Sequence, residues 1–209
     1  MYHLPHFKAN YPNDVFAFMQ AHPFITLCGC SPEGWPVATH IPVLIEKRSE
    51  TIFLTGHVMR NQLHTLAYEA NNKVLAIFQG PESYVSAAWY SPPAVASTWN
   101  YMAVHASGII RFLDDAGLYQ LLVRQTRYFE GTANSTADVE KMPADYVKEN
   151  MKAIVAFEIE VTQCNHVFKL SQNKDEESFQ SVVGHLKTGN ATQQALANEM
   201  LKIKIQSAK

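Results

Sequence analysis

The chain has few cysteines, little charge and no long apolar run, and each absence removes a class of protein. Only Cys28, Cys30 and Cys164 occur in 209 residues, so a disulfide framework is not expected and a reducing compartment, the cytoplasm, is the simplest interpretation. No apolar stretch approaches membrane-spanning length, and the first residues lack the basic start and apolar run of a signal peptide. We therefore expect neither export nor a membrane anchor.

The chain also lacks an excess of positive charge. Its 17 lysines and arginines stand against 19 aspartates and glutamates, a formal net charge of -2, so no global field draws it to phosphate backbones. No helix-turn-helix is evident, and the basic residues are not gathered into one stripe. DNA is a possible partner that neither charge nor motif supports.

Short motifs of several enzyme classes are missing. There is no Gly-x-Ser-x-Gly elbow, P-loop or dinucleotide fingerprint, so acyl transfer, nucleotide hydrolysis and Rossmann-type binding have no motif support. The nine histidines form no His-Glu-x-x-His pattern and no Cys-x-x-Cys is present, so no metal site is predicted. Cys28 and Cys30 project to one face of an expected strand, and we expect them to pack in the core.

Short apolar runs between turn-forming residues dominate the first third of the chain. A helix is predicted from Asn13 to His22. The β-prone runs Phe24–Cys30 and Val37–Ile45 are separated by a segment with proline and glycine, which predicts a hairpin. A third strand, Thr51–His57, leads into a helix that ends at Ala70.

The middle of the chain continues this alternation of strands and turns. Val74–Gln79 is a continuous apolar run of buried-strand type, and Gly80-Pro81 after it predicts a turn. Ser91-Pro92-Pro93 predicts a loop. Thr98–Leu113 predicts a long strand with a bulge or bend at Gly108.

Helices become more frequent towards the end. Asp114-Asp115 caps a predicted helix, and the small polar residues of Gly131–Met142 predict a surface loop. Strict two-residue alternation over Val155–Val161 is the clearest strand pattern in the chain. Two helices follow, Phe179–Gly189 and Ala191–Ile205.

These elements together predict a fold class. Six or more strands in hairpin succession, with inserted and appended helices, indicate a mainly β, α+β protein built on a small antiparallel barrel. A doubly wound α/β fold is the weaker alternative, because the early strands are joined by turns too short for parallel crossovers. We expect one domain over residues 1–209, with residues 175–209 as a helical C-terminal extension.

Two segments carry residues suited to a ligand. The first, Thr55–Gln62, ends a strand and opens a helix, so backbone N–H groups and Arg60 converge where a phosphate could bind. The second, Thr98–Tyr101, places two aromatic rings beside an amide, as a planar heterocycle requires. Each has an ordinary alternative, a solvated first-turn arginine for the first and aromatic packing of a core or interface for the second.

Six separated sequence blocks occur in order along nearly the whole chain. They are Thr39-His40-Ile41-Pro42, Gly56-His57-Val58-x-Arg60, Phe78-Gln79-Gly80-Pro81-x-x-Tyr84, Trp89-Tyr90, Thr98-Trp99-Asn100-Tyr101-x-x-Val104-His105 and Lys169-Leu170-Ser171-Gln172-Asn173. Together they resemble the PaiB family, described as FMN-binding negative transcriptional regulators. The resemblance implies a split β-barrel similar to pyridoxamine-phosphate oxidases and flavin reductases, assembled as a homodimer with FMN at the interface.

The resemblance also implies which residues bind the cofactor. Arg60 would hold the FMN phosphate with help from Asn61 or Gln62, and the later segments would lie nearer the ring. The full implied set is His57, Arg60, Asn61, Gln62, Gln79, Thr98, Trp99, Asn100, Tyr101, Lys169 and Gln172.

The chain departs from the family pattern at two places. The family has an asparagine two positions after the arginine, whereas here Asn61 is adjacent and Gln62 takes the expected place. The family's Ser-Pro-x-Trp-Tyr stretch appears as Ser86-Ala87-Ala88-Trp89-Tyr90, which removes a rigid proline. Both changes affect the expected retention of the cofactor.

Three functions are consistent with the resemblance. A flavin-binding transcriptional regulator is the first, and no catalytic residue is assigned to it. A flavin-dependent oxidoreductase acting on a small molecule is the second, since many split-barrel relatives are such enzymes. A haem-binding or haem-degrading protein is the third.

Overall fold

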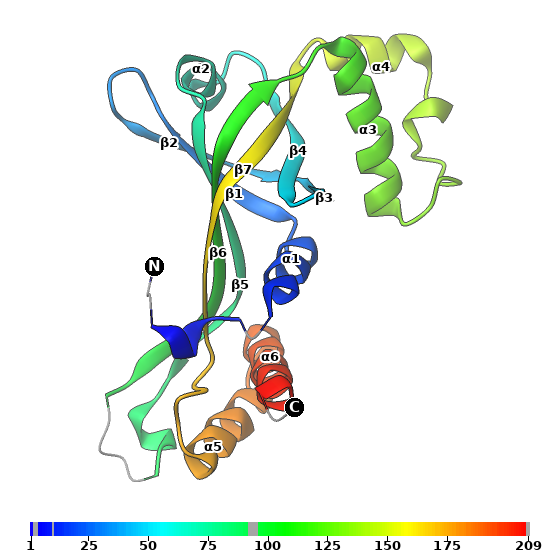
Figure 1. Ribbon diagram of the computed structural model, residues 1–209. Helices are drawn as coiled ribbons and strands as arrows, with labels where there is room; N and C mark the ends of the chain where they lie inside the picture. The colour runs from blue at the N-terminus through cyan, green and yellow to red at the C-terminus, as the bar shows by residue number, and fades with distance from the viewer. Residues whose placement is uncertain (2–3, 10, 92–95, 208–209) are drawn as a thin grey trace. The chain divides into compact units, whose positions relative to one another are not determined.

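The computed structural model describes residues 1, 4–9, 11–91 and 96–207, so the loop predicted at Pro92-Pro93 lies outside the described residues. The chain divides into two compact units. Unit 1 comprises Met1–His22, Gln79–Val104 and Asn165–Lys209, and unit 2 comprises Pro23–Phe78 and His105–Cys164. Three long strands contribute residues to both units (Figure 1). The expectation of a single domain over 1–209 stays a prediction.

Within the described residues, seven strands form one sheet in the order β2-β1-β5-β6-β7-β4-β3. The pairs β1–β2, β1–β5, β3–β4 and β4–β7 are antiparallel. The strands are β1 (Phe24–Cys30), β2 (Pro36–Pro42), β3 (Leu44–Arg48), β4 (Thr51–Met59), β5 (Lys73–Val85), β6 (Thr98–Phe112) and β7 (Ile154–Lys169). Antiparallel pairing of neighbours along the chain excludes the doubly wound alternative.

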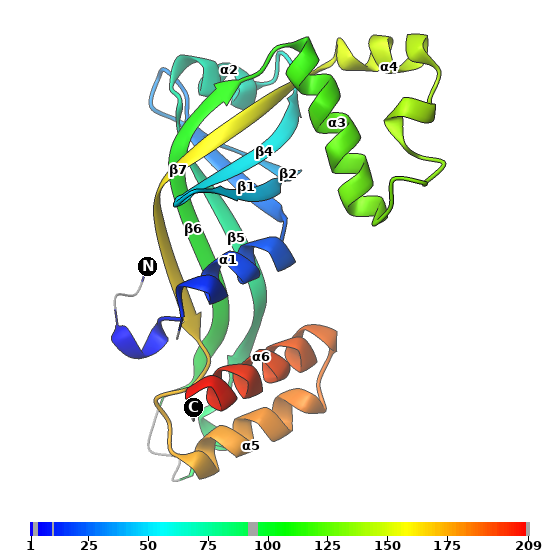
Figure 2. The same cartoon turned by 45° about the vertical axis from the view of Figure 1, so that its right-hand side comes forward.

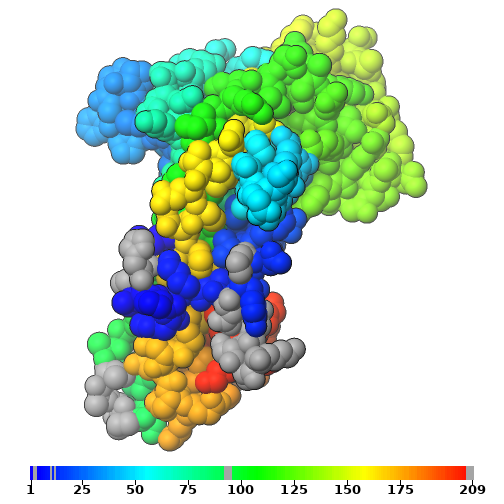
Figure 3. Space-filling model, viewed as in Figure 1, coloured from blue at the N-terminus to red at the C-terminus, as the bar shows by residue number. Residues whose placement is uncertain are grey.

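Unit 2 carries its helices beside the sheet. They are α2 (Leu63–Ala70), α3 (Asp115–Glu130), the 3-10 turn η3 (Val139–Lys141) and α4 (Ala144–Met151). Asp114 caps α3 as predicted, accepting a hydrogen bond from the Gly117 N–H at 2.8 Å. Leu118 and Leu121 of α3 then pack on Leu44 and Ala156. Figures 1 and 2 show α3 and α4 side by side, and their atoms form one continuous lobe in Figure 3.

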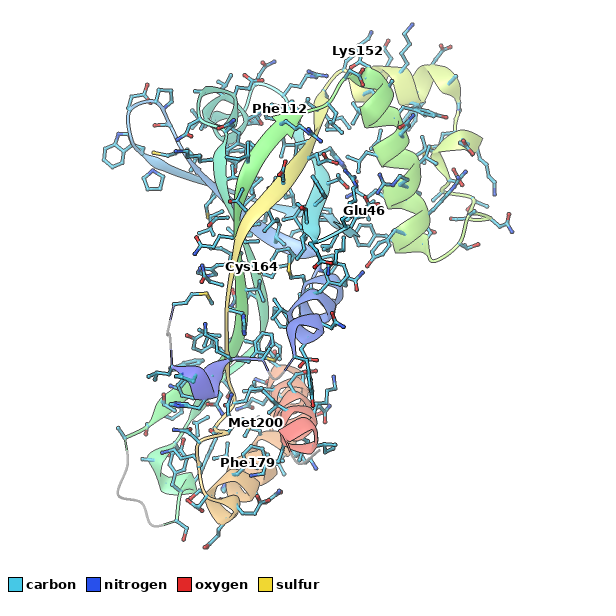
Figure 4. The ribbon with its side chains drawn as sticks, in the orientation of Figure 1. Glu46, Phe112, Lys152, Cys164, Phe179 and Met200 are labelled. Atoms are coloured by element: carbon cyan, nitrogen blue, oxygen red, sulfur yellow. The ribbon has the colours of Figure 1, made fainter. Side chains whose placement is uncertain are left out.

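The helices of unit 1 lie near the start of the chain, after β5 and at its C-terminal end. They are η1 (Pro5–Phe7), α1 (Pro12–Ala21), η2 (Ala87–Trp89), α5 (Glu176–Lys187) and α6 (Ala191–Ser207). Phe179 on α5 and Met200 on α6 are both fully buried, and Figure 4 shows them on these adjacent helices. No helix among the described residues is long and apolar enough to cross a membrane.

Three sequence expectations differ from the structure. Gly80-Pro81 is not a turn, because β5 runs through it to Val85. A Cβ on Gly80 would lie 2.6 Å from a Phe18 ring carbon, so the glycine permits close packing of α1 rather than a reversal. The strand predicted over Val37–Ile45 is two strands, β2 and β3, which break at Val43.

The third difference concerns the two thiols of β1. Cys28 and Cys30 are half-buried and free, not core residues. Ile25 and Leu27, on the other face of the same strand, are the buried ones. The core-packing expectation is therefore wrong: the cysteines do share one face, but the core lies against the opposite face of β1.

Candidate functional site

The turn between β4 and α2 is held at both ends by hydrogen bonds. The Arg60 N–H donates to the Ala153 carbonyl at 2.8 Å, and the Thr65 hydroxyl donates to the Met59 carbonyl at 2.7 Å. Asn61 has a φ of 58°, in the left-handed region that asparagine tolerates better than most residues. The backbone therefore places the side chains of residues 60–62 in a defined corner before α2.

Arg60 is only loosely paired. Its Nη2 lies 3.4 Å from Asp115 Oδ1, and the two side chains are 39% and 85% exposed. Ion pairs at such exposure add little stability, so the guanidinium keeps donors for another anion. Asn61 and Gln62 are exposed, and the Gln62 side chain does not cap α2. The corner thus offers one guanidinium and two amides within three residues.

A cavity of about 640 Å³ opens beside Arg60. Apolar side chains from η3 and α4, among them Val147 and Met151, line it together with Met142. Lys148 and Lys152 add two cations, and Lys152 is labelled just after α4 in Figure 4. Asp115 and Glu140 are the carboxylates among the described lining residues, so cations outnumber them.

Sequence reasoning missed the contribution of α4 to this cavity. The only available signal was spacing, because Val147 and Met151, and likewise Lys148 and Lys152, are four residues apart and share a helix face. Nothing in the sequence connects that face to Arg60, about ninety residues earlier.

His57 makes a specific contact with α3. Its Nδ1 lies 3.0 Å from Gln125 Oε1, while Gln125 Nε2 donates to the Pro42 carbonyl at 3.3 Å. A carbonyl can only accept, so the amide orientation is set and Nδ1 carries the proton. Burial lowers the pKa of His57, and the bond to Gln125 offsets this only in part, so the ring is neutral near pH 7. His57 does not line the Arg60 cavity.

The residues predicted near a flavin ring divide between two faces of β6. Trp99 is 55% exposed and Tyr101 is half-buried, whereas Asn100 between them is fully buried. Trp99 contacts the Tyr84 ring with centroids 6.2 Å apart. We call the side of the sheet bearing Trp99 and Tyr101 the open face and the side bearing Thr98 and Asn100 the covered face.

Gln79 belongs to the open face. Its neighbour Gly80 points the other way, because a Cβ there would meet Phe18 and lie 3.2 Å from the Met102 Cβ. Met102 is on the same face of β6 as Asn100, so Gln79 lies opposite, exposed like Trp99. The open face therefore combines an amide with aromatic rings.

The two predicted residues of the later segment differ in their contacts. Lys169 donates a hydrogen bond to the Thr98 hydroxyl and lines a cavity with Thr98 and Asn100. Gln172 closes its own turn, because its Oε1 accepts from the Leu170 N–H at 2.7 Å, and it does not line that cavity. Their predicted roles at a cofactor stay predictions.

Comparison with known proteins identifies the family. Residues 1–163 match the family described as "Putative FMN-binding domain". Over 209 residues, 98% of this chain and 100% of the relative, the chain is 32% identical to protease synthase and sporulation protein PAI 2 of Bacillus subtilis. The chain belongs to the PaiB family. This confirms the resemblance in the sequence blocks, and PaiB membership supports a flavin as the cofactor.

Solved structures similar to this PaiB-family chain share its fold. A conserved hypothetical protein of Mycobacterium tuberculosis aligns with a TM-score of 0.59 at 12% identity, over 84% of this chain and 95% of that one. The FAD and haem binding protein of Mycobacterium smegmatis has a TM-score of 0.59 at 15% identity, over 83% and 78%. A flavocytochrome of Azotobacter vinelandii has 0.53 at 17%, over 81% and 73%. The predicted split β-barrel with flanking and C-terminal helices is confirmed.

Proposed function

We propose that this PaiB-family chain binds FMN and that the Arg60 corner holds the phosphate of the cofactor. The observation that carries the proposal is a loosely paired guanidinium on a strand-to-helix turn, beside a cavity of about 640 Å³ with further lysines. A phosphate there would meet charge-assisted donors from Arg60 and the first N–H groups of α2. When bound, FMN supplies the redox chemistry.

The side chains around the corner fit a phosphate ester. Asn61 and Gln62 present amide donors at the surface, and Lys148 and Lys152 add positive potential to the cavity. Asp115 opposes this charge, but at 85% exposure its effect is screened by solvent. Val147 and Met151 add apolar surface that an organic part of the ligand could contact.

We infer that the open face is covered by the flavin ring and a second copy of this chain. Trp99 and Tyr84 are 55% and 46% exposed, and Gln79 is exposed beside them. Exposed aromatic side chains gathered on one sheet face are typical of ligand and subunit contacts. A homodimer with FMN at its interface would bury them. Size-exclusion chromatography with light scattering tests this, and a monomer at micromolar concentration contradicts it.

The cellular role that we propose is negative regulation of transcription, with the cofactor or its redox state biasing the contact with a partner. A gel-shift titration over a range of salt tests direct DNA contact, since phosphate contacts weaken steeply with salt. Absence of binding at low salt contradicts direct repression. A flavin-dependent oxidoreductase is the second candidate, favoured by a cavity of about 640 Å³ beside Arg60 that has room for a small molecule. Rapid flavin reduction after mixing with NADH or NADPH would favour it.

The absorption spectrum of purified protein tests the cofactor directly. Flavin bands support the proposal, and a Soret band with no flavin would favour the haem alternative instead. An FMN titration of Arg60→Ala then tests the site, with an expected loss of about 1.5–3 kcal/mol in binding free energy. Arg124→Ala is the matched control, because Arg124 is 44% exposed and also pairs with a carboxylate. Equal affinities of the two variants would remove Arg60 from the phosphate site.

A further inference from the structure

A second cavity lies within unit 1, on the covered face of β6. It has a volume of about 460 Å³, and its polar lining includes Thr98, Asn100, Lys169, Ser171 and Lys174. These residues come from the start of β6, from the last residue of β7 and from the chain between β7 and α5. The cavity shares no lining residue with the one beside Arg60.

Asn100 is the most constrained polar group in this cavity. The residue is fully buried, and its Nδ2 donates to Ser171 Oγ at 2.8 Å and lies 3.8 Å from Met200 Sδ. Ser171 Oγ can donate or accept, but the Met200 thioether can only accept, so the sulfur identifies the nitrogen side of the amide. Among the described residues, no donor lies within hydrogen-bond reach of Asn100 Oδ1. A buried carbonyl oxygen without a donor destabilises the fold unless a bound molecule supplies one.

Positive charge surrounds this acceptor. Lys169 and Lys174 both line the cavity, and the Lys174 Nζ lies 4.8 Å from the centre of the Tyr90 ring. No carboxylate occurs among the described lining residues. Burial lowers the pKa of Lys169, and Lys174 lowers it further, as expected for cations gathered in a partly dry site. The cavity therefore favours an anion.

The two requirements together define the ligand. We propose that this cavity binds a small anion that carries a hydroxyl group, with its charged oxygens against Lys169 and Lys174 and its hydroxyl donating to Asn100 Oδ1. An ammonium donor does not fit, because two lysines repel it. The aromatic residues of the open face, Trp99 and Tyr101, lie on the opposite side of β6, so the ligand is additional to a flavin stacked there.

A titration of the full chain followed by NMR tests the proposal with lactate and propionate. The two carboxylates differ by one hydroxyl, so lactate should bind about tenfold more tightly. Lactate should also shift the side-chain amide signal of Asn100, which is assigned by its loss in Asn100→Leu. A second pair of probes repeats the comparison for phosphate-type anions: hydrogen phosphate carries a hydroxyl, whereas sulfate carries none at neutral pH. Comparing the affinities for hydrogen phosphate and lactate then distinguishes a phosphate from a hydroxy acid.

Variants separate the two contacts. Asn100→Leu should remove the advantage of lactate over propionate, while Lys169→Met should weaken both by about tenfold. Gln180→Leu, an exposed amide on α5, is the matched control and should change neither. The comparison of probes on the unaltered chain stands even if Asn100→Leu does not fold.

Three outcomes would overturn the proposal. They are no shift of the Asn100 signal with either hydroxyl-bearing probe, equal binding of the probes with and without a hydroxyl, and displacement of the bound probe by an equivalent of FMN. Arg60→Ala keeps this test distinct from the cofactor proposal, because it should lose FMN affinity and still bind the probe.

Discussion

Two of the arginine–carboxylate arrangements in unit 2 have sharply different surroundings. Glu158 is 7% exposed and lies between two arginines, with Arg48 Nη1 2.7 Å from its Oε2 and Arg111 bonded to its Oε1. Arg60 and Asp115 are both exposed and 3.4 Å apart. The buried carboxylate depends on its partners because it has no water to replace them, whereas the exposed pair can separate at little cost. The same chemistry thus supports the fold at one place and leaves a cation for a ligand at the other.

The largest expected effect comes from breaking the buried arrangement. Glu158→Ala should lower the free energy of unfolding by about 1.5–3 kcal/mol, since it removes the buried acceptor of two charge-assisted hydrogen bonds, while Arg48 and Arg111 are 45% and 64% exposed and stay solvated. Denaturant unfolding measures this. Glu160→Ala is the control, because Glu160 lies two residues further along β7 and is exposed. This variant should change the free energy of unfolding by less than about 0.5 kcal/mol. Equal losses of stability in the two variants would show that the burial and the arginine partners of Glu158 do not matter for the fold.

Acid should reveal the same carboxylate. Burial alone raises the pKa of Glu158, but hydrogen bonds from Arg111 and Arg48 outweigh it and hold the pKa below the ordinary value. The stability it contributes is then fully present above the unfolded value of about 4.3 and is lost as pH falls through the folded pKa. Thermal unfolding from pH 6 downwards should show this loss, and Glu158→Gln should have a flatter curve below about pH 4.

The exposed pair should respond to charge removal in binding rather than in stability. Asp115→Asn frees Arg60 and should tighten FMN by about 0.2–1 kcal/mol, more at low salt. Asp145→Asn is the control, because Asp145 also lies in the first turn of a helix of unit 2 but outside the cavity lining. Weaker FMN binding by Asp115→Asn would mean that the carboxylate contacts the cofactor.

The smallest effect is expected for Arg60 on folding. Arg60→Ala should change the free energy of unfolding by less than about 0.5 kcal/mol, because its partner is solvated and the turn is held by backbone bonds. Denaturant unfolding without cofactor checks this. A loss above about 1 kcal/mol would show that Arg60 belongs to the fold as Glu158 does.

Local patterns predicted most of the secondary structure. The strand Phe24–Cys30 and the helix end at Ala70 match the sequence reading, because both depend on neighbours along the chain. The prediction of a turn at Gly80-Pro81 is wrong, because the role of Gly80 depends on Phe18 of α1, which packs against it and is distant in sequence. The alternation over β7 predicted a strand but not the burial of Glu158, which needs arginines from β3 and β6.

The candidate site was predicted only in part for the same reason. Arg60 could be singled out because it stands at a strand-to-helix boundary that the local pattern reveals. The lysines of α4 and the donor-less oxygen of Asn100 could not, because they depend on contacts between segments far apart in sequence. The six sequence blocks were sufficient to predict the family. The charges around each cavity could be described only from the tertiary contacts.

Side chains along β6 alternate between the open and the covered face, so the register of the strand decides which face each residue occupies. Deleting or inserting a single residue at the head of this strand would rotate the pattern by half a turn. The indole of Trp99 would then be forced among Ser171 and the two lysines, while the amide of Asn100 would face outwards. A substitution in β6 alters one side chain on one face, whereas a shift of one residue exchanges the side chains of the open and covered faces.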